Sequence, residues 1–168
     1  MNEEITRPLG LEGDDFKDMI PPVVERTVLY LHEEIDVKIE KVYKPSTTIE
    51  KRRLRRMTAI IAVNGRFNFM ISLSFDKHFL EEMFKRMTEG MDVPEEEVPL
   101  YKREAAGDMA NTIIGNCTPI FEKPGERVGL SPPLILEGGR NVQAPAGAVH
   151  YGIRLKTDIG FMDIDFFC

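Results

Sequence analysis

One stretch of the sequence, Leu100 to Cys117 (LYKREAAGDMANTIIGNC), carries polar residues at a spacing that could do chemistry. On a helix, successive residues are turned by about 100°, so residues three and four apart share a side. One side would carry Glu104, Asp108, Asn111 and Gly115, here called the polar row. The opposite side would be an apolar stripe wide enough to bury: Ala106, Met109, Ala110, Ile113, Ile114 and Cys117.

The polar row contains no good nucleophile and no base of near-neutral pKa, so it cannot hydrolyse a substrate by side-chain acid–base chemistry alone. It could act on a substrate that brings its own metal and leaving group. The carboxamide of Asn111 can accept a hydrogen bond from a water and hold that water in line with a phosphoryl group. Asp108, three residues earlier, can pair with a lysine of the partner, and Gly115 leaves room for a protein surface to approach. A solvated helix side that happens to contain an acid and an amide is the simpler interpretation, and composition alone favours it.

No other familiar catalytic pattern is present in the sequence. His32, His78 and His150 are scattered without metal-ligand spacing, and a structural or solvated role is favoured for each. Gly138-Gly139 lacks the lysine and the following helix of a phosphate-binding loop. No serine lies in a nucleophile elbow, and neither cysteine has the surroundings of an activated thiol.

Size and composition predict a protein of the cytoplasm with one main domain. The 168 residues suffice for one core, which we place at 14–168, after a loose polar arm at 1–13. The net charge of −6 argues against a general affinity for nucleic acid or anionic membranes. Two cysteines, Cys117 and Cys168, make no disulfide framework and fit a reducing compartment. The N-terminus has no apolar core, and no apolar run approaches the ~20 residues that span a bilayer.

Hydrophobic periodicity predicts an α/β protein of the α+β type. Pro21 and Pro22 should kink or restart the first helix, and Asn64-Gly65 should turn the first hairpin. Pro132 and Pro133 should place their extended segment at a strand start or at a sheet edge. Asp76 should begin a helix that Gly90 ends. The expected elements are helix 14–34, strand 36–43, hairpin 57–75, the helix after 76, helix 100–117, strand 127–137, a loop at 138–147 and hairpin 149–167.

The only basic cluster is Lys51 to Arg56, KRRLRR. No aromatic residues interleave with it, and the whole chain is acidic, so a nucleic-acid patch is disfavoured. We interpret the cluster as a solvated loop or as a guard of an edge strand.

The order helix, strand, loop, hairpin occurs twice in the predicted elements, which indicates two similar halves with an extra helix between them. This order predicts two long helices packed on an antiparallel sheet. The first long helix carries Glu25 and Arg26 but no asparagine three residues after an acid. Only the second half therefore carries the polar row.

The segment EAAGDMANTIIGN, Glu104 to Asn116, resembles the signature helix of the CheC/CheX/FliY group of chemotaxis phosphatases, most closely its single-site CheX branch. The signature of that helix is an acidic residue followed three positions later by an asparagine, and Asp108 and Asn111 match it here. A polar residue four before the acid is matched by Glu104, and a later proline by Pro132 or Pro133. The closing strands YGIRLKTDIGFMDIDFF and the hairpin IIAVNGRFNFMISLSF also look like the pattern of the group.

This resemblance implies a CheC-like fold and a phosphatase that acts on the aspartyl phosphate of a response-regulator receiver domain, typically CheY. Asn111 would orient the attacking water, and Asp108 would pair with the receiver's lysine. The receiver would hold the Mg²⁺, so the chain would need no metal or other cofactor of its own. Members of the CheX branch are similar in carrying one site per chain and forming a homodimer.

Two features of the resemblance leave an alternative open. The usual acid of the group is glutamate, and Asp108 is one methylene shorter, so Glu104 could substitute or assist. Related flagellar-switch proteins share the fold and bind partners without catalysis. A non-catalytic interaction or scaffold module is therefore the second interpretation.

Overall fold

The computed structural model describes residues 13–43, 46–47, 51–65, 68–143 and 148–168. The expected N-terminal arm, 1–13, lies outside these ranges except for Gly13, with which the first helix begins. Within the described ranges, no helix combines the length and the apolar character needed to span a bilayer.

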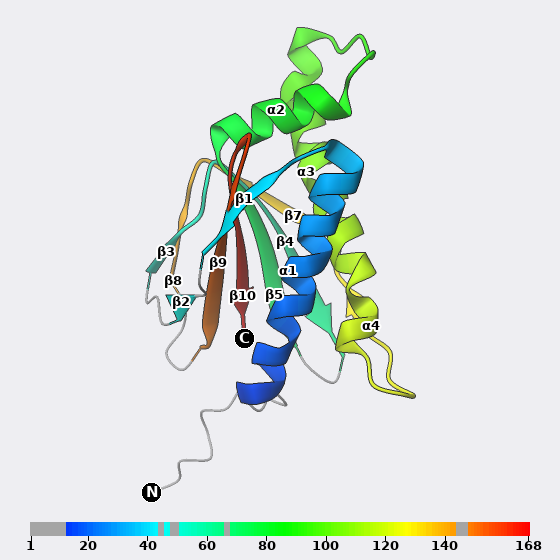
Figure 1. Ribbon diagram of the computed structural model, residues 1–168, viewed down its shortest axis with the longest axis vertical. Helices are drawn as coiled ribbons and strands as arrows, with labels where there is room; N and C mark the ends of the chain where they lie inside the picture. The colour runs from blue at the N-terminus through cyan, green and yellow to red at the C-terminus, as the bar shows by residue number, and fades with distance from the viewer. Residues whose placement is uncertain (1–12, 44–45, 48–50, 66–67, 144–147) are drawn as a thin grey trace, which may run out of the picture.

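The two long helices lie side by side on one face of an antiparallel sheet (Figure 1), as the sequence predicted. They are α1 (Gly13–Ile35) and α3 (Val98–Asn116), and they run in opposite directions. Helix α2 (Lys77–Met87) crosses one end of the sheet. The short helices η2 (Glu95–Glu97) and α4 (Thr118–Phe121) flank α3 at its two ends.

All strand pairs are antiparallel, and the main sheet has the order β1-β9-β10-β5-β4-β6. Strand β2 also pairs with β9, and β7 also pairs with β4, whereas β3 and β8 form a separate two-stranded sheet. The strands are β1 (Ile39–Val42), β2 (Ser46–Thr47), β3 (Lys51–Arg53), β4 (Met57–Asn64), β5 (Phe69–Phe75), β6 (Gly129–Leu130), β7 (Leu134–Glu137), β8 (Asn141–Gln143), β9 (His150–Thr157) and β10 (Gly160–Phe167).

The two similar halves are confirmed, and their edge strands are exchanged. Strand β1 of the first half pairs with β9 of the second, while β6 and β7 of the second half pair with β4 of the first. The central pair β5–β10 joins the two hairpins, with Leu73 opposite Ile164. Neither half can therefore complete its sheet without the other.

The core lies between the sheet and the helices, because alternate strand residues point to the same side. Ile61, Leu73, Phe75 and Phe166 are fully buried on that side. Helix α2 adds Phe79, Leu80 and Met83. The predicted start of α2 is confirmed, since the side chain of Asp76 accepts a hydrogen bond from the backbone N of Phe79 at 2.8 Å.

The turn predicted at Asn64-Gly65 is not a two-residue turn, because Val63 pairs with Phe69 and the connection between these residues is longer. Gly65 has another role. A methyl group there would lie 3.2 Å from the carbonyl oxygen of Arg127. This glycine therefore lets the segment that leads into β6 approach β4.

Helix α1 continues through Pro21 and Pro22, so the helix does not restart there, and the kink stays a prediction. Two other expectations are corrected by the structure. The strand expected at 127–137 is divided into β6 and β7 around Ser131, whose hydroxyl accepts a hydrogen bond from the backbone N of Ala62 at 2.9 Å. The loop expected at 138–147 contains β8, and this strand pairs with β3. The loop interpretation of the basic cluster is therefore wrong for 51–53.

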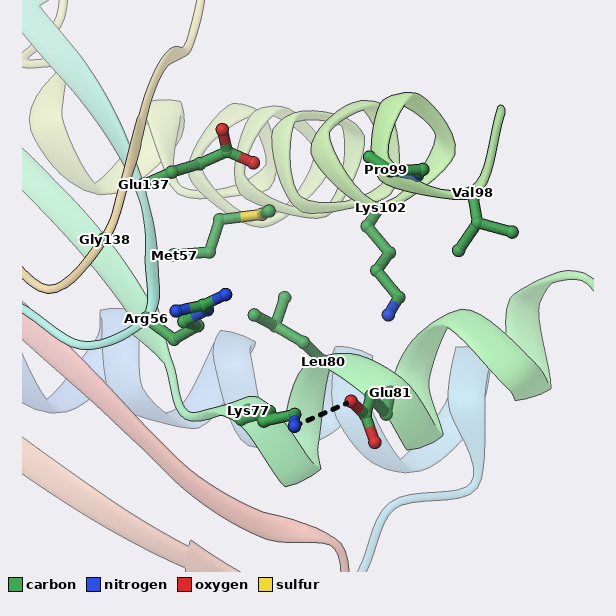
Figure 2. Close-up of a pocket in the computed structure, with 10 residues that line it drawn as sticks. All are labelled: Arg56, Met57, Lys77, Leu80, Glu81, Val98, Pro99, Lys102, Glu137 and Gly138. Carbon is green, nitrogen blue, oxygen red and sulfur yellow. Dashed lines mark ion pairs between the residues drawn. The ribbon is translucent and has the colours of Figure 1, made fainter. Parts of the chain in front are cut away.

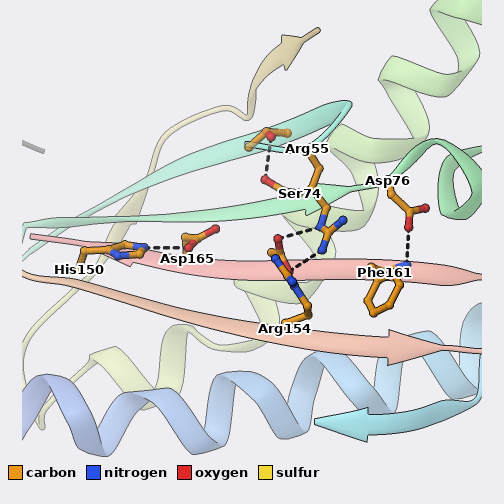
Figure 3. A network of polar contacts seen from close by, with 9 residues as sticks. Arg55, Ser74, Asp76, His150, Arg154, Phe161 and Asp165 are labelled. Carbon is orange, nitrogen blue, oxygen red and sulfur yellow. Dashed lines mark hydrogen bonds and ion pairs between the residues drawn. The ribbon is translucent and has the colours of Figure 1, made fainter. Parts of the chain in front are cut away.

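The sheet face opposite the long helices, here called the outer face, is also largely buried and carries paired polar groups (Figure 3). The His150 Nε2 and Asp165 Oδ1 atoms are 2.8 Å apart, and the hydroxyls of Thr58 and Ser74 are 2.7 Å apart. Asp163 is only 2% exposed. A buried carboxylate needs charged or hydrogen-bonding partners to offset its lost hydration, and these pairs and the partners of Asp163 described below meet that need.

Candidate active site

Helix α3 is held against the sheet by a side made of small and branched residues. Ala106, Met109 and Ile113 are fully buried, and Ala105 and Gly107 extend this surface with little side-chain volume. The small residues let the helix axis come close to the sheet. Pro99 lies in the first turn, where its missing N–H costs no hydrogen bond. The position of α3 is therefore set by its buried side.

The polar row lies on the exposed side of α3, as predicted. Glu104, Asp108 and Asn111 are exposed, and Gly115 is partly exposed. In the part of the chain that the structure describes, the side chains of Glu104, Asp108 and Asn111 take part in no hydrogen bond or ion pair. Their hydrogen-bonding capacity is therefore available to an external partner. The chemical roles of these residues remain predictions.

Strand β7 bounds the row on one side. A methyl group at Gly107 would lie 3.4 Å from Cγ of Pro133 and 3.6 Å from Cδ1 of Ile135, which is ordinary van der Waals contact, so alanine would fit here and a larger side chain would meet β7. A groove of about 620 Å³ runs between α3 and β7, and its lining includes Glu104, Asp108 and Pro133. This arrangement brings Pro133, one of the two prolines matched by the resemblance, beside the row.

An ion pair links α3 to β7 beside this groove. Nη1 of Arg103 on α3 is 3.7 Å from Oε2 of Glu137 on β7, and both side chains are about half exposed, at 50% and 48%. Such an exposed pair contributes at most about 1 kcal/mol to stability.

Helix α1 bounds the row on the other side through Tyr30, a residue that the sequence did not indicate. Partial burial raises the pKa of the Tyr30 phenol, and the nearby carboxylates of Glu34 and Asp108 raise the pKa further. The phenol is therefore a neutral hydrogen-bonding group close to Asp108. Its position depends on the packing of α1 beside α3, which no local pattern reveals.

Among the described residues, neither Cys117 nor His150 is an activated nucleophile beside the row. Burial raises the pKa of the Cys117 thiol to about 11, with Arg26 lowering it by a smaller amount, so this cysteine is a neutral thiol near pH 7. His150 is buried on the outer face beside Asp165. Among the described residues, no group of three or more His, Cys, Asp or Glu side chains is placed to hold a metal ion.

Comparison with known proteins identifies related sequences and folds. The family model for the chemotaxis phosphatase CheX matches residues 57–155. The solved chemotaxis protein CheX from Desulfovibrio desulfuricans superposes with a TM-score of 0.76 at 19% identity, covering 89% of this chain and 97% of that one. CheX from Vibrio vulnificus superposes with a TM-score of 0.73 at 16% identity, with coverages of 90% and 99%.

A third solved structure contains a partner protein. A chain of the CheX–CheY–BeF3–Mg²⁺ complex from Borrelia burgdorferi superposes with a TM-score of 0.67 at 17% identity, covering 89% of this chain and 96% of that one. At these identities the solved structures establish a shared fold. No curated protein matches the chain significantly.

The two glycines of α3 differ in a way that stability measurements can detect. Around Gly115 no atom lies within 4 Å of an added methyl group, so Gly115→Ala is expected to raise the free energy of unfolding by about 0.5–1 kcal/mol through better helix propensity. Gly107→Val is expected to lower it by about 1–3 kcal/mol, because the larger side chain would push β7 away. Urea unfolding followed by circular dichroism measures both changes. Equal effects of the two substitutions would contradict the packing described here.

Proposed function

The chain belongs to the family of the chemotaxis phosphatase CheX, and we propose that it hydrolyses the aspartyl phosphate of a CheY-like receiver domain with the polar row of α3. The observation that carries this proposal is the pair Asp108 and Asn111. Both side chains are exposed on one side of a helix whose other side is buried, and neither is engaged by another described residue.

Asn111 is the catalytic residue in this proposal. Its carboxamide oxygen accepts a hydrogen bond from a water and holds the water oxygen in line with the phosphorus atom. The water oxygen then bonds to phosphorus as the bond from phosphorus to the aspartyl oxygen breaks. The receiver's carboxylate leaves, and the proton of the water passes to the phosphate or to solvent. A fixed side chain contributes here by removing the entropy cost of orienting the water.

Asp108 is the binding residue of the pair. Cβ atoms three residues apart on a helix lie about 5–6 Å from each other, so a lysine bound to Asp108 would be close to the water held by Asn111. A hydrogen bond between two charged groups is stronger than one between neutral groups and also sets the register of the two surfaces. Glu104 lies one turn before Asp108 in the polar row, and Gly115 allows the partner to come close to the helix.

We assign the metal to the partner. Mg²⁺ on the receiver would neutralise the charge of the phosphoryl oxygens, and the chain would supply no ligand to it. A CheY-like receiver works in the cytoplasm, which is therefore the proposed compartment. The sequence features that support it are the two unpaired cysteines, Cys117 and Cys168.

Asn111→Ala is expected to lower the turnover of a phosphorylated receiver about 100-fold or more, with little change in KM, because the water is no longer held. The assay mixes the protein with a CheY-type receiver phosphorylated by acetyl phosphate, in Mg²⁺, and follows phosphate release. Asn116→Ala removes an exposed asparagine from the same helix and is the matched control. If Asn111→Ala accelerates phosphate release as much as the native chain does, Asn111 does not hold the attacking water and the proposed mechanism is wrong. Binding of the receiver with no acceleration would favour the scaffold interpretation.

Asp108→Ala is expected to raise KM about 10- to 100-fold with a smaller effect on turnover, because a hydrogen bond to a charged group is lost. Asp108→Glu keeps the charge, so association should remain within a few-fold of the native value. Asp92→Ala removes one exposed carboxylate outside the row and serves as the charge control. If Asp108→Ala lowers turnover and leaves KM unchanged, Asp108 does not bind the partner.

We further propose that the protein is a homodimer formed through an edge of the sheet. Strands β1 and β7 are edge strands of the main sheet, and Val42 and Leu134 on them are 49% and 58% exposed. A free edge can pair with the same edge of a second copy about a two-fold axis. Light scattering is expected to give twice the chain mass of 19.2 kDa. A monomer mass at the concentrations of the phosphatase assay would contradict this.

A further inference from the structure

A basic cavity lies on the outer face of the sheet, at the end covered by α2. Its volume is about 440 Å³. Four basic side chains and two carboxylates line it, which leaves an excess of positive charge in a chain whose net charge is −6. These six residues are Arg55, Arg56, Lys77, Arg154, Asp76 and Asp163.

Both carboxylates of this basic cavity are already engaged within the protein (Figure 3). Asp76 accepts hydrogen bonds from the backbone N atoms of Phe79 and Phe161, each at 2.8 Å. Asp163 accepts one from Nε of Arg55 at 2.7 Å and one from Nε of Arg154 at 3.0 Å. Few acceptor positions therefore remain in the cavity, and its open hydrogen-bonding groups are mainly donors.

The donors are held in place before any ligand arrives. The guanidinium of Arg55 lies 5.3 Å from the centroid of the Phe161 ring while it binds Asp163, and its side chain is only 19% exposed. Arg154 is tied to the same carboxylate from the next strand. Within the described residues, Arg55 and Arg154 make no side-chain hydrogen bond except those to Asp163. The outer N–H groups of both guanidiniums are therefore free to donate to a ligand.

The remaining two cations complete the donor set. In the described part of the chain, the side chain of Arg56 has no ion pair. Lys77 contacts Glu81 only loosely, at 3.9 Å on the exposed side of α2. Planar guanidiniums match the oxygen atoms of phosphate in paired hydrogen bonds, and an ammonium adds a point charge.

We propose that this basic cavity binds the phosphate groups of a small phosphorylated organic molecule of about nucleotide size. A second cavity, of about 410 Å³, continues from it and shares Arg56, Lys77 and Gly138 (Figure 2). Its walls include the apolar side chains of Met57 and Leu80, which suit the organic part of such a ligand.

Carboxylates in the second cavity also favour an organic group over further phosphates. Glu81 and Glu137 line it and can accept hydrogen bonds from ligand hydroxyls. Lys102 projects from α3 toward α2 at its other side (Figure 2). None of these residues belongs to the polar row, so the site is separate from the proposed reaction at Asp108 and Asn111.

Calorimetric titration of the full chain with pyrophosphate, ADP and adenosine, in EDTA, tests the proposal. Pyrophosphate and ADP are expected to bind, ADP more tightly, and adenosine not to bind. Arg56→Gln and Arg154→Gln should each raise the dissociation constant for pyrophosphate about tenfold or more. Lys123→Gln, which removes an exposed cation in the loop after α4, should leave it unchanged.

The outcomes separate the parts of the proposal. Absence of heat with both pyrophosphate and ADP, or equal binding by the native chain and Arg56→Gln, overturns the phosphate site. Adenosine binding as tightly as ADP overturns phosphate recognition. Equal affinities for pyrophosphate and ADP overturn the placement of the organic part in the second cavity. Thermal unfolding of each variant without ligand verifies that the fold is intact. Arg56 is exposed, so Arg56→Gln tests the site without disturbing the sheet, whereas Arg154→Gln also removes one of the two arginines that pair with Asp163.

Discussion

The antiparallel pairing of β5 with β10 is the contact on which the rest of the structure depends. It joins two similar halves at the centre of the sheet. Because each half gives its edge strands to the hairpin of the other, the pairing also decides where β1 and β7 can lie. The two long helices then share one face, and α3 contacts both α1 and β7. Folding of the two halves is expected to be coupled for this reason.

The candidate active site uses this arrangement to place two side chains accurately without burying them. The buried side of α3 fixes the helix, while Gly107 lets β7 come close beside Asp108. A site built on a rigid helix keeps the separation of Asp108 and Asn111 constant. That constancy suits the proposed reaction, in which the partner brings the phosphoryl group and this chain positions the attacking water. Because Asp108 is one methylene shorter than the glutamate usual in the group, the partner's lysine must approach the helix more closely to pair with it.

The two faces of the sheet solve different physical problems. The face under the helices is apolar and gains stability from burial. The outer face buries carboxylates, which is costly unless charged partners compensate them, and Arg55 and Arg154 do so for Asp163. Arg55, a member of the basic cluster that the sequence suggested was a solvated loop, is thus paired with the sheet. Arg55 and Arg56 add positive charge at one end of an acidic protein.

Much of this protein follows from the sequence itself. Periodicity and local boundary signals such as Asp76 placed α1, α2, α3 and both hairpins within a few residues. Periodicity also put Asp108 and Asn111 on the exposed side of α3, because helical and strand faces are local properties. The exchange of edge strands, the pairing of β3 with β8, the position of Tyr30 beside Asp108 and the burial of Asp163 were not predictable in this way. Each of them joins residues far apart in the chain. Such contacts are selected by the packing of the whole sheet, which only the tertiary structure decides.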